Sequence, residues 1–171
     1  MIRVGILTVS DRGARGERED KSGQVIRTML EANGAEVVCY AIVPDEGPAI
    51  RDRLLEWADR EGLDLVLTTG GTGFSARDIT PEATAAVLDR PAPGISEAIR
   101  AEGRKKTPHA ILSRATSGIR GRTLIINLPG SPKGVEQSLE VVLPALPHAI
   151  EVLRGEVVEC AVEVSSKAPE M

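Results

Sequence analysis

A glycine-rich segment that follows an apolar stretch is the part of the sequence best suited to chemistry. It covers residues 68–82 and has three glycines within four positions, at Gly70, Gly71 and Gly73. Glycine has no Cβ, so the backbone N–H groups of such a segment can closely approach a phosphate or another anion. The alternative is a plain turn between a strand and a helix. Since loops on a rigid scaffold often carry binding residues, we expect this run, with Thr72 inside it, to bind an anionic ligand.

Two well-known phosphate-binding motifs do not fit this glycine-rich segment. A Walker loop needs a lysine before its serine or threonine, and no lysine lies between Gly70 and Glu82. Residues 71–76 match the letters of a dinucleotide-binding fingerprint, whose last glycine or alanine belongs inside the following helix. Here Thr80 and Pro81 form an N-cap and first-turn pair, so the helix begins after the match. A Rossmann-type dehydrogenase is therefore disfavoured.

Carboxylates occur in the same region. Asp78 lies in the glycine-rich segment, and Asp45, next to Glu46, follows another apolar stretch. Two carboxylates beside phosphate groups are a common way to hold Mg²⁺. Alternatively, Asp45 interacts with a helix N-terminus and Asp78 shapes a turn. Because both aspartates follow predicted strands, we expect them to meet at one end of a sheet and to form a functional site.

The segment Asn127–Gly134 is a second candidate anion site, because it ends an apolar stretch and opens a helix. Ser131 or Pro132 at the helix start leaves backbone N–H groups free, and Lys133 adds a positive charge. A plain turn made of proline and glycine is the alternative.

The remaining reactive groups do not form a nucleophile and its base. The sequence has no G-x-S-x-G elbow, Cys39 lies in an apolar stretch and His148 lies near prolines. Four cations in the first loop could bind phosphates, although charges on a long loop are usually solvated: Arg12, Arg15, Arg18 and Lys21. Glycine loops, carboxylates and cations suit phosphoryl or nucleotidyl transfer, in which positioning and charge neutralisation dominate.

Strand-like and helix-like apolar patterns alternate along the chain. Strands are predicted at residues 2–9, 36–43, 63–69 and 122–127. Helices are predicted at residues 25–32, 50–58, 81–89 and 94–106, with a short turn at 108–114, a helix from Pro132, and a last helix ending near Leu153 after Pro144 and Pro147. The alternation predicts an α/β protein with a mostly parallel sheet covered on both faces. Its ligands should bind where the loops after Val9, Val43, Thr69 and Asn127 converge.

Composition narrows the function classes. The 171 residues predict one domain, with 42% hydrophobic residues and a formal net charge of −4, but only one Phe, one Tyr and one Trp. So few rings, without a basic groove, disfavour binding of nucleic acid. Two cysteines and two histidines far apart in sequence disfavour structural zinc. The first apolar stretch is too short for a membrane span and has no signal cleavage site, so we expect a cytoplasmic protein without membrane contact.

Seven short motifs occur in order along the chain: Ser10–Arg12, Asp20–Gly23, Val43–Glu46, Thr68–Thr84, Pro93–Gly94, Ile111–Arg114 and Asn127–Lys133. The blocks that read GGTG, RDITPEAT and NLPGSPK are the most specific. Together the motifs resemble the molybdenum cofactor biosynthesis family, and more narrowly its molybdopterin adenylyltransferases of the MogA/MoaB type. The resemblance spans about residues 2–155.

The resemblance implies a fold, an assembly and a reaction. The fold is a three-layer αβα sandwich over residues 1–155, with 156–171 as an extension or tail, and the assembly is a homotrimer or a hexamer. The reaction transfers AMP from ATP to the terminal phosphate of molybdopterin with Mg²⁺ and releases pyrophosphate. A separate protein would then insert molybdenum. By the same resemblance Asp45 and Asp78 are the catalytic and metal-binding residues, and the ligand pocket contains Ser10, Asp11, Gly70, Gly71, Thr72, Gly73, Ser113, Asn127, Pro129, Gly130, Ser131 and Lys133.

Two other functions stay open: a non-catalytic pterin-binding or scaffold protein, and a hydrolase of nucleotide pyrophosphates. The presence of Asp45, Asp78 and Lys133 favours the transferase. The sequence is compatible with a trimer or a hexamer, and with a pathway that uses molybdenum or tungsten. Because Trp57 and Tyr40 are expected in the core, Phe74 is the only ring predicted at the site. The ligand should be held mainly through phosphates, backbone amides and aliphatic walls.

Overall fold

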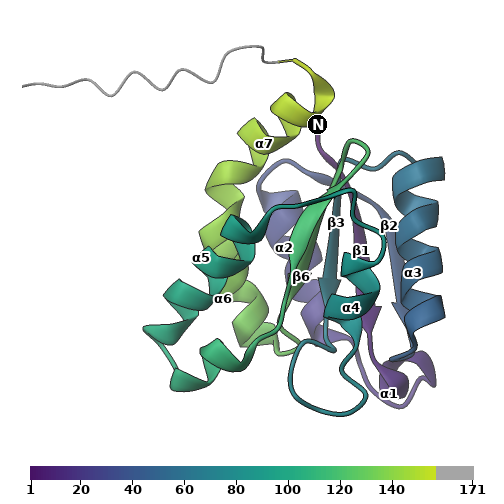
Figure 1. Cartoon of the computed structure of the whole chain (residues 1–171), viewed down its shortest axis with the longest axis vertical. Coiled ribbons are helices and arrows are strands. Elements are labelled where there is room, and N and C mark those ends of the chain that lie inside the picture. The colour runs from purple at the N-terminus through teal and green to yellow at the C-terminus, as the bar shows by residue number, and fades with distance from the viewer. Residues whose placement is uncertain (157–171) are drawn as a thin grey trace, which may run out of the picture.

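A six-stranded mixed sheet lies at the centre of the structure, a computed structural model that describes residues 1–156 (Figure 1). The strand order is β2-β1-β3-β6-β5-β4. The strands are β1 (Arg3–Val9), β2 (Glu36–Val43), β3 (Leu65–Thr69), β4 (Arg90–Pro91), β5 (Ser117–Arg120) and β6 (Thr123–Leu128). The α-helices are α1 (Asp11–Ala14), α2 (Lys21–Ala32), α3 (Gly47–Leu55), α4 (Thr80–Ala85), α5 (Pro93–Arg104), α6 (Pro132–Val142) and α7 (Leu146–Arg154). A π-helical turn, η1 (Glu56–Arg60), and two 3₁₀ turns, η2 (Pro108–Leu112) and η3 (Leu143–Ala145), complete the elements.

The four strands predicted from the sequence form the parallel part of the sheet. β1 pairs with β2 and β3, and β3 pairs with β6, all in parallel. Every residue of β3 and β6 is buried, as expected for strands covered on both faces. The prediction of an α/β fold with a mostly parallel sheet is confirmed.

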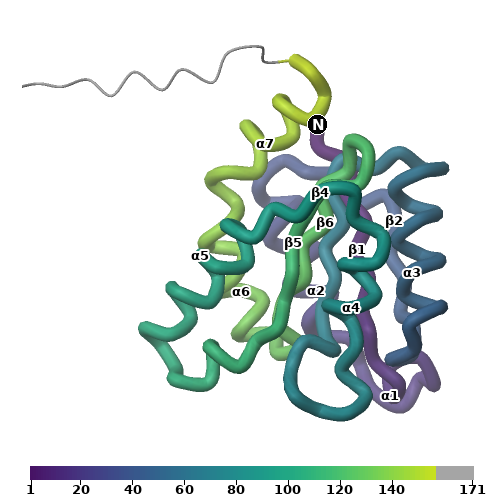
Figure 2. Tube along the Cα trace, in the orientation of Figure 1, coloured from purple at the N-terminus to yellow at the C-terminus, as the bar shows by residue number. Residues whose placement is uncertain are grey.

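The sequence patterns did not predict β5 and β4, which extend the sheet in antiparallel pairing (Figure 2). β5 has four residues and β4 has two, so neither is long enough to show a clear alternation of apolar and polar residues. A two-residue link joins β5 to β6, and its Gly121 has a φ of 55°, which favours glycine.

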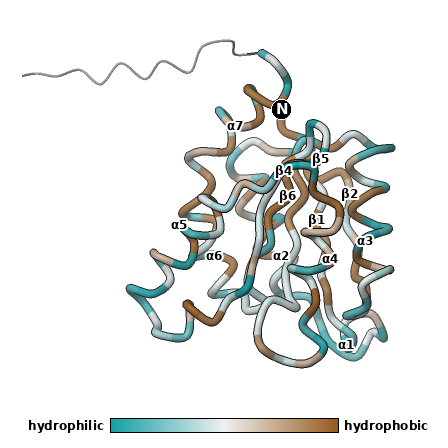
Figure 3. The backbone as a smooth tube through the Cα atoms, in the orientation of Figure 1, coloured by the Kyte–Doolittle hydropathy of each residue, from teal (hydrophilic) through white to brown (hydrophobic). Residues whose placement is uncertain are grey.

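Two separate apolar cores give the fold its three layers. On one face of the sheet, α2, α5, α6 and α7 pack against side chains such as Ile6, Leu67 and Ile126. On the other face, α3, η1 and α4 cover Leu7 and Val66. Adjacent strand residues therefore point into different cores. In Figure 3 the hydrophobic colour gathers in the central strands, and the hydrophilic colour is prominent on the outer helices.

The first loop is more ordered than predicted. Residues 10–23 were expected to be a loop, but α1 begins directly after Ser10, whose hydroxyl accepts the Gly13 N–H at 3.0 Å. α2 begins at Lys21 rather than at Val25, because the Asp20 carboxylate caps it. The sequence pattern missed these caps since the apolar spacing of the helix starts only at Val25.

The other predicted helices are present with small differences in their ends. α4 ends at Ala85 rather than Asp89, because the Asp89 N–H donates to Ile119 O and joins the chain to β5. Pro144 lies in the 3₁₀ turn that separates α6 from α7, and α7 ends at Arg154, close to the predicted Leu153. Of the predicted extension or tail at 156–171, residues 157–171 lie outside the described residues.

The carboxyl ends of β1, β2, β3 and β6 meet at the lower end of the molecule in Figure 1, where α1 and the loop between β3 and α4 also lie. Residue 1 and α7 lie at the opposite end. Across residues 1–156, no helix has the length and hydrophobicity that a membrane crossing requires.

Candidate active site

A cavity of about 890 Å³ opens at the carboxyl ends of the parallel strands. We call it the acidic cavity, because Glu17, Glu19, Asp20, Asp45 and Asp78 all line it. The loops after β1, β2, β3 and β6 all contribute to its wall, as the sequence predicted. Seven residues expected at the site line this cavity: Ser10, Asp45, Gly70, Gly71, Asp78, Gly130 and Ser131.

Asp45 is held by a reciprocal pair of hydrogen bonds with Asp11. The Asp11 N–H donates to Asp45 Oδ2 at 2.9 Å, and the Asp45 N–H donates to Asp11 Oδ1 at 3.0 Å. Arg77, in the glycine-rich segment, donates to both carboxylate oxygens of Asp11 at 3.0 and 2.8 Å. The loops after β1, β2 and β3 are thereby joined through one carboxylate, which orients Asp45.

Asp78 closes a tight turn within the glycine-rich segment. Its Oδ2 accepts the Ser75 N–H at 3.0 Å, and its own N–H donates to Ser75 O at 2.9 Å. A Cβ atom at Gly73 would lie 3.0 Å from Asp78 Oδ2, and one at Gly71 would lie 3.1 Å from Asp45 Oδ1. Both carboxylates therefore lie against the glycine run, which confirms that the two aspartates meet at one edge of the sheet.

The surroundings of Asp45 and Asp11 move their pKa values in opposite directions. Burial raises the pKa of Asp45 above its ordinary value, and the negative charges of Asp11 and Asp78 add to this, although the hydrogen bond from the Asp11 N–H opposes it. The hydrogen bonds from Arg77 lower the pKa of Asp11. The fold thus disfavours the ionised form of Asp45, and a cation bound beside this carboxylate would favour it.

Hydroxyl groups hold the carbonyls of the glycine-rich loops. Three of them each donate to one carbonyl: Thr80 to Gly70 at 2.9 Å, Thr69 to Pro129 at 2.6 Å and Ser22 to Gly130 at 2.7 Å. The loop after β3 and the loop after β6 also touch directly, because a Cβ at Gly130 would lie 3.4 Å from the Gly70 Cα. These bonds fix the backbone around the acidic cavity.

The glycine run has the backbone shape expected of an anion site. Gly70 and Gly71 have φ values of 96° and 69°, and a Cβ at Gly70 would collide with the carbonyl oxygen of Val9. Within residues 1–156, the N–H groups of Gly71, Thr72 and Gly73 donate no hydrogen bond to the chain. These three donors are available to an anionic ligand.

Two helices begin at the acidic cavity. Lys21 and Ser22 of α2, and Ser131 and Pro132 at the start of α6, all line it. A helix N-terminus carries a partial positive charge, so both ends favour phosphate groups here.

Two of the four cations of the first loop line the acidic cavity, and the other two do not. Arg18 and Lys21 line the acidic cavity, whereas Arg15 pairs with Glu17 at 3.0 Å and neither Arg12 nor Arg15 lines it. Folding of α1 and the cap of α2 bring Arg18 and Lys21 to the site, and neither feature was visible in the apolar pattern.

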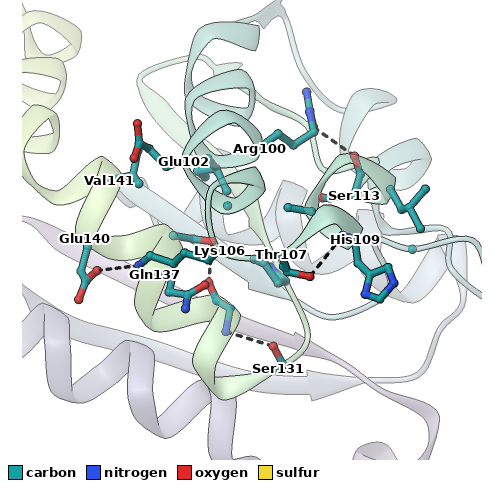
Figure 4. A pocket seen from close by; sticks show the side chains of 18 of the residues that line it. Arg100, Glu102, Lys106, Thr107, His109, Ser113, Ser131, Gln137, Glu140 and Val141 are labelled. Atoms are coloured by element: carbon teal, nitrogen blue, oxygen red, sulfur yellow. Dashed lines mark hydrogen bonds and ion pairs between the residues drawn. The ribbon is translucent and has the colours of Figure 1, made fainter.

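A second cavity, of about 810 Å³, lies between α5, η2 and α6 (Figure 4). We call it the α5–α6 cavity. Its wall combines apolar groups such as Ile99, Ala110 and Val141 with the polar side chains of residues such as Gln137. Lys106, just after α5, pairs with Glu140 of α6 at 3.7 Å and so bridges the two helices that form the wall.

The two cavities adjoin at the glycine-rich loops. Ser131 lines both of them. In the loop after β3, Gly71 lines the acidic cavity and Gly73 lines the α5–α6 cavity. In the loop after β6, Gly130 lines the acidic cavity and Pro129 lines the α5–α6 cavity. The loops after β3 and β6 therefore form a thin partition between a carboxylate-lined space and a partly apolar one.

The remaining expected residues divide into two groups. Three line the α5–α6 cavity alone: Gly73, Ser113 and Pro129. Four line neither cavity: Asp11, Thr72, Asn127 and Lys133. Lys133 is exposed on the first turn of α6.

Asn127 is fully buried and acts within the fold. Its Nδ2 donates to Thr68 Oγ1 and Thr84 Oγ1, both at 2.9 Å, and its Oδ1 accepts the Thr116 N–H at 3.2 Å. This side chain holds the end of β6 against β3 and α4, just before the partition between the cavities.

Asp20 was quoted in a motif but was not expected at the site. It accepts hydrogen bonds from Thr8 Oγ1 at 2.6 Å, from the Gly23 N–H at 2.9 Å and from the Tyr40 hydroxyl, and it lines the acidic cavity. Burial and the Asp20 carboxylate raise the pKa of Tyr40. The signal that could have found Asp20 was its place three residues before Gly23, which is N-cap spacing.

The expectation of a core position was correct for Trp57 but wrong for Tyr40, and the expected place of Phe74 at the ligand site stays a prediction. Trp57 is 4% exposed and belongs to the core, and Phe74 lines the α5–α6 cavity. Tyr40 is 40% exposed, because it lies on β2 at the edge of the sheet, and Arg27 covers its ring.

The donor set fits a metal ion that arrives with its substrate. Among residues 1–156, no group of three or more His, Cys, Asp or Glu side chains is arranged to hold a metal ion. Asp45 and Asp78 offer carboxylate oxygens beside the free N–H groups of the glycine run. Mg²⁺ commonly binds one or two carboxylates together with substrate phosphates and water.

A family model described as "Probable molybdopterin binding domain" matches residues 5–148. The chain belongs to this family of molybdenum cofactor biosynthesis proteins, so the resemblance inferred from the motifs is confirmed. It is 45% identical over 157 residues to a molybdopterin adenylyltransferase of Helicobacter pylori, covering 90% of this chain and 89% of that protein.

Other relatives agree in length and fold. A molybdopterin adenylyltransferase of Escherichia coli K12 is 38% identical over 177 residues, covering 95% of this chain and 91% of that protein. The crystal structure of the molybdopterin biosynthesis enzyme MoaB from Thermus thermophilus superposes with a TM-score of 0.86 at 59% identity, covering 91% of this chain and 98% of that one. These matches confirm the α/β sandwich.

Proposed function

We propose that this protein is a Mg²⁺-dependent molybdopterin adenylyltransferase in molybdenum cofactor biosynthesis. It transfers AMP from ATP to the terminal phosphate of molybdopterin and releases pyrophosphate. The observation that carries the proposal is the pair of adjoining cavities, one lined by carboxylates and the other partly apolar. The names of relatives at 45% and 38% identity support the same reaction.

The reaction needs two phosphate groups to meet. A phosphate oxygen of molybdopterin forms a bond to the α-phosphorus of ATP, and the bond from that phosphorus to the bridging β-oxygen breaks. Pyrophosphate leaves with the electron pair of that bond. No covalent intermediate with the protein is required, so the protein acts by positioning and by neutralising charge.

The acidic cavity supplies the groups for this step. Asp45 and Asp78 would hold Mg²⁺, which neutralises phosphate charge when it is bound. The N–H groups of residues 71–73 and the starts of α2 and α6 would hold phosphate oxygens. Lys21 and Arg18 add positive charge at the cavity wall.

The α5–α6 cavity suits the organic part of molybdopterin. Aliphatic residues such as Val141 and the exposed ring of Phe74 provide apolar contacts, and Gln137 and Ser113 provide polar ones. Because Ser131 and the glycine loops lie between the cavities, a phosphate on the pterin could reach the acidic cavity across this partition. The ATP phosphates would then lie on the carboxylate side.

The protein's surroundings in the cell form part of the same proposal. We place it in the cytoplasm as a homotrimer or hexamer that delivers adenylylated molybdopterin to a separate molybdenum-insertion protein. Sedimentation of the purified chain measures the assembly, and a monomer at micromolar concentration would refute it.

The deciding experiment mixes purified protein with molybdopterin, ATP and Mg²⁺ and measures pyrophosphate. We expect one pyrophosphate for each adenylylated molybdopterin, and none without pterin or without Mg²⁺. Binding of pterin without pyrophosphate release would identify a non-catalytic binding protein instead. Release of AMP from ATP or ADP-ribose without pterin would identify a hydrolase.

A further inference from the structure

We infer that Arg114 is a positioning residue for adenylyl transfer, because it holds the loop that carries Asp78. This inference rests on the proposed function. Arg114 lines neither cavity, so its effect on a bound ligand passes through the loop.

Arg114 contacts the loop between β3 and α4 on both sides of its tip. Its backbone N–H donates to Thr72 O at 2.9 Å, its Nε to Gly73 O at 2.9 Å and its Nη2 to the Asp78 carbonyl oxygen at 2.6 Å. Its Nη1 pairs with Glu82 in the first turn of α4. One side chain therefore spans the loop from the glycine run to the helix that follows Asp78.

The tip of the loop has few other attachments to the domain. Residues 74–77 are exposed, and the Phe74 side chain is 71% exposed, so no apolar core anchors these four residues, whereas Ile79 packs against the core and Thr80 bonds to Gly70 O and Gly71 O at the base of the loop. The internal turn between Ser75 and Asp78 shapes the tip but does not attach it to the rest of the domain. Arg77 attaches the tip to Asp11, whereas Arg114 attaches the carbonyls on both sides of the tip.

The backbone that carries Arg114 is itself held in place. Arg100 of α5 donates from Nη1 to Ala115 O at 2.8 Å and to Ser113 O at 3.4 Å, on either side of Arg114. The Thr116 N–H donates to the buried Asn127. Arg114 thus links a segment that is itself held by hydrogen bonds, next to the α5–α6 cavity, to the backbone of Asp78, whose carboxylate lines the acidic cavity.

The chemistry of the guanidinium group makes this role specific to arginine. Its planar fork reaches two carbonyl oxygens and one carboxylate at the same time, which a lysine ammonium group on a flexible stem cannot do. Burial acts to raise the pKa of Glu82, but the hydrogen bond and the charge of Arg114, together with a backbone hydrogen bond, hold that pKa below its ordinary value. A displacement of about 1 Å at a reacting group can cost about 100-fold in rate.

The test compares Arg114→Ala and Arg114→Lys with Arg120→Ala. Arg120 is the matched control, because its guanidinium also binds a carboxylate and a carbonyl oxygen, those of Asp59 and Val87, and it also lines neither cavity, but it does not contact the loop that carries Asp78. We expect kcat for pyrophosphate release to fall about 10- to 100-fold in both Arg114 variants and the apparent Mg²⁺ affinity to weaken. Added guanidinium ion should restore part of kcat in Arg114→Ala, and Arg120→Ala should keep the Mg²⁺ dependence of the wild type.

A double variant tests whether Arg114 acts through Asp78. In the Arg114→Ala background, Asp78→Asn should cost much less activity than it costs in the wild type. Equal costs in the two backgrounds would overturn the inference, as would wild-type kcat and Mg²⁺ dependence in Arg114→Lys.

Hydrogen exchange provides a readout that does not need the reaction. Peptides covering residues 72–82 should exchange faster in Arg114→Ala than in the wild type, while those of β1 and β6 should not change. If the wild type released no pyrophosphate, the proposed function would fail and this measurement would still decide whether Arg114 orders the loop. Unchanged exchange in residues 72–82 would refute the positioning role even if the enzyme were active.

Discussion

The acidic cavity and the α5–α6 cavity adjoin, yet they are built in different ways. The acidic cavity is formed by loops at the ends of parallel strands, and hydrogen bonds fix several of the groups that shape it, such as Asp45 and Ser22. The α5–α6 cavity is formed by helix faces and by side chains such as Val141 and the exposed Phe74. The first is suited to fixed charges on phosphates, and the second to the varied outline of an organic molecule.

The largest effect should come from removing a carboxylate of the acidic cavity. Asp78→Asn keeps the shape of the side chain and can still accept the Ser75 N–H. We expect at least about a 100-fold loss of kcat for pyrophosphate release, because a preorganised charge at the reacting phosphates is lost. Circular dichroism should show an unchanged fold. Wild-type turnover in this variant would remove Asp78 from the mechanism.

The raised pKa of Asp45 predicts an effect on both activity and stability. In the folded protein Asp45 keeps its proton to a higher pH than in the unfolded chain, so stability falls as pH rises through that interval and stays lower above it. Asp45→Asn should therefore melt at a higher temperature than the wild type at pH 7, in the absence of Mg²⁺. The variant should also lose about 10- to 100-fold in kcat.

Thermal melts and rates measured against pH check this prediction for Asp45. The acid limb of kcat/KM in the wild type should lie above the ordinary range of an aspartate. A lower melting temperature for Asp45→Asn at pH 7 would contradict the account of Asp45 as a group whose ionised form the fold disfavours.

A substitution that fills the α5–α6 cavity should weaken binding of molybdopterin without weakening binding of ATP. Val141→Trp places a larger side chain on the wall formed by α6. We expect KM for molybdopterin to rise about 10-fold, since the apolar wall contacts the organic part of the ligand. Binding of ATP with Mg²⁺, measured by calorimetry without pterin, should stay within about twofold. An equal loss for both ligands would show that the cavities do not divide the substrates.

The smallest effect should come from the single ring at the site. Phe74→Ala removes a side chain that is 71% exposed, so only its contact with the ligand is lost. A stacked ring contributes roughly 0.5–1.5 kcal/mol, so molybdopterin affinity should fall by about two- to tenfold. Undiminished affinity in a titration would show that phosphates, amides and aliphatic walls suffice.

The two cavities also differ in how much of them the sequence predicted. Gly70, Asp45 and Asp78 were predicted at the acidic cavity because parallel strands bring their following loops together. The wall residues of the α5–α6 cavity, such as Gln137 and Val141, have the pattern of ordinary amphipathic helices, and only packing of α5 against α6 makes them a wall. A pattern within one segment carries no information on which other segment will face it.

The features of the fold that the sequence did not predict also depend on contacts between separate segments. β5 was missed because four residues that include Gly118 show no alternation, and it is its pairing with β6 that makes them a strand. Tyr40 was assigned to the core because its neighbours are apolar, but β2 lies at an edge of the sheet. Arg114 bonds to backbone carbonyls distant in sequence, and Asp20 bonds to the side chains of Thr8 and Tyr40, and no local spacing shows these contacts.

The ends of the described domain lie together, far from both cavities. Arg154 in α7 donates to the carbonyl oxygen of Met1 at 2.9 Å and to Asp64 at 2.9 and 2.7 Å, so the first strand and the last helix are joined at the end opposite the loops (Figure 1). A fusion partner attached at either end would begin from the same small patch and leave both cavity mouths open. The same closeness makes the domain suited to circular permutation, with a short linker across this patch and new ends elsewhere.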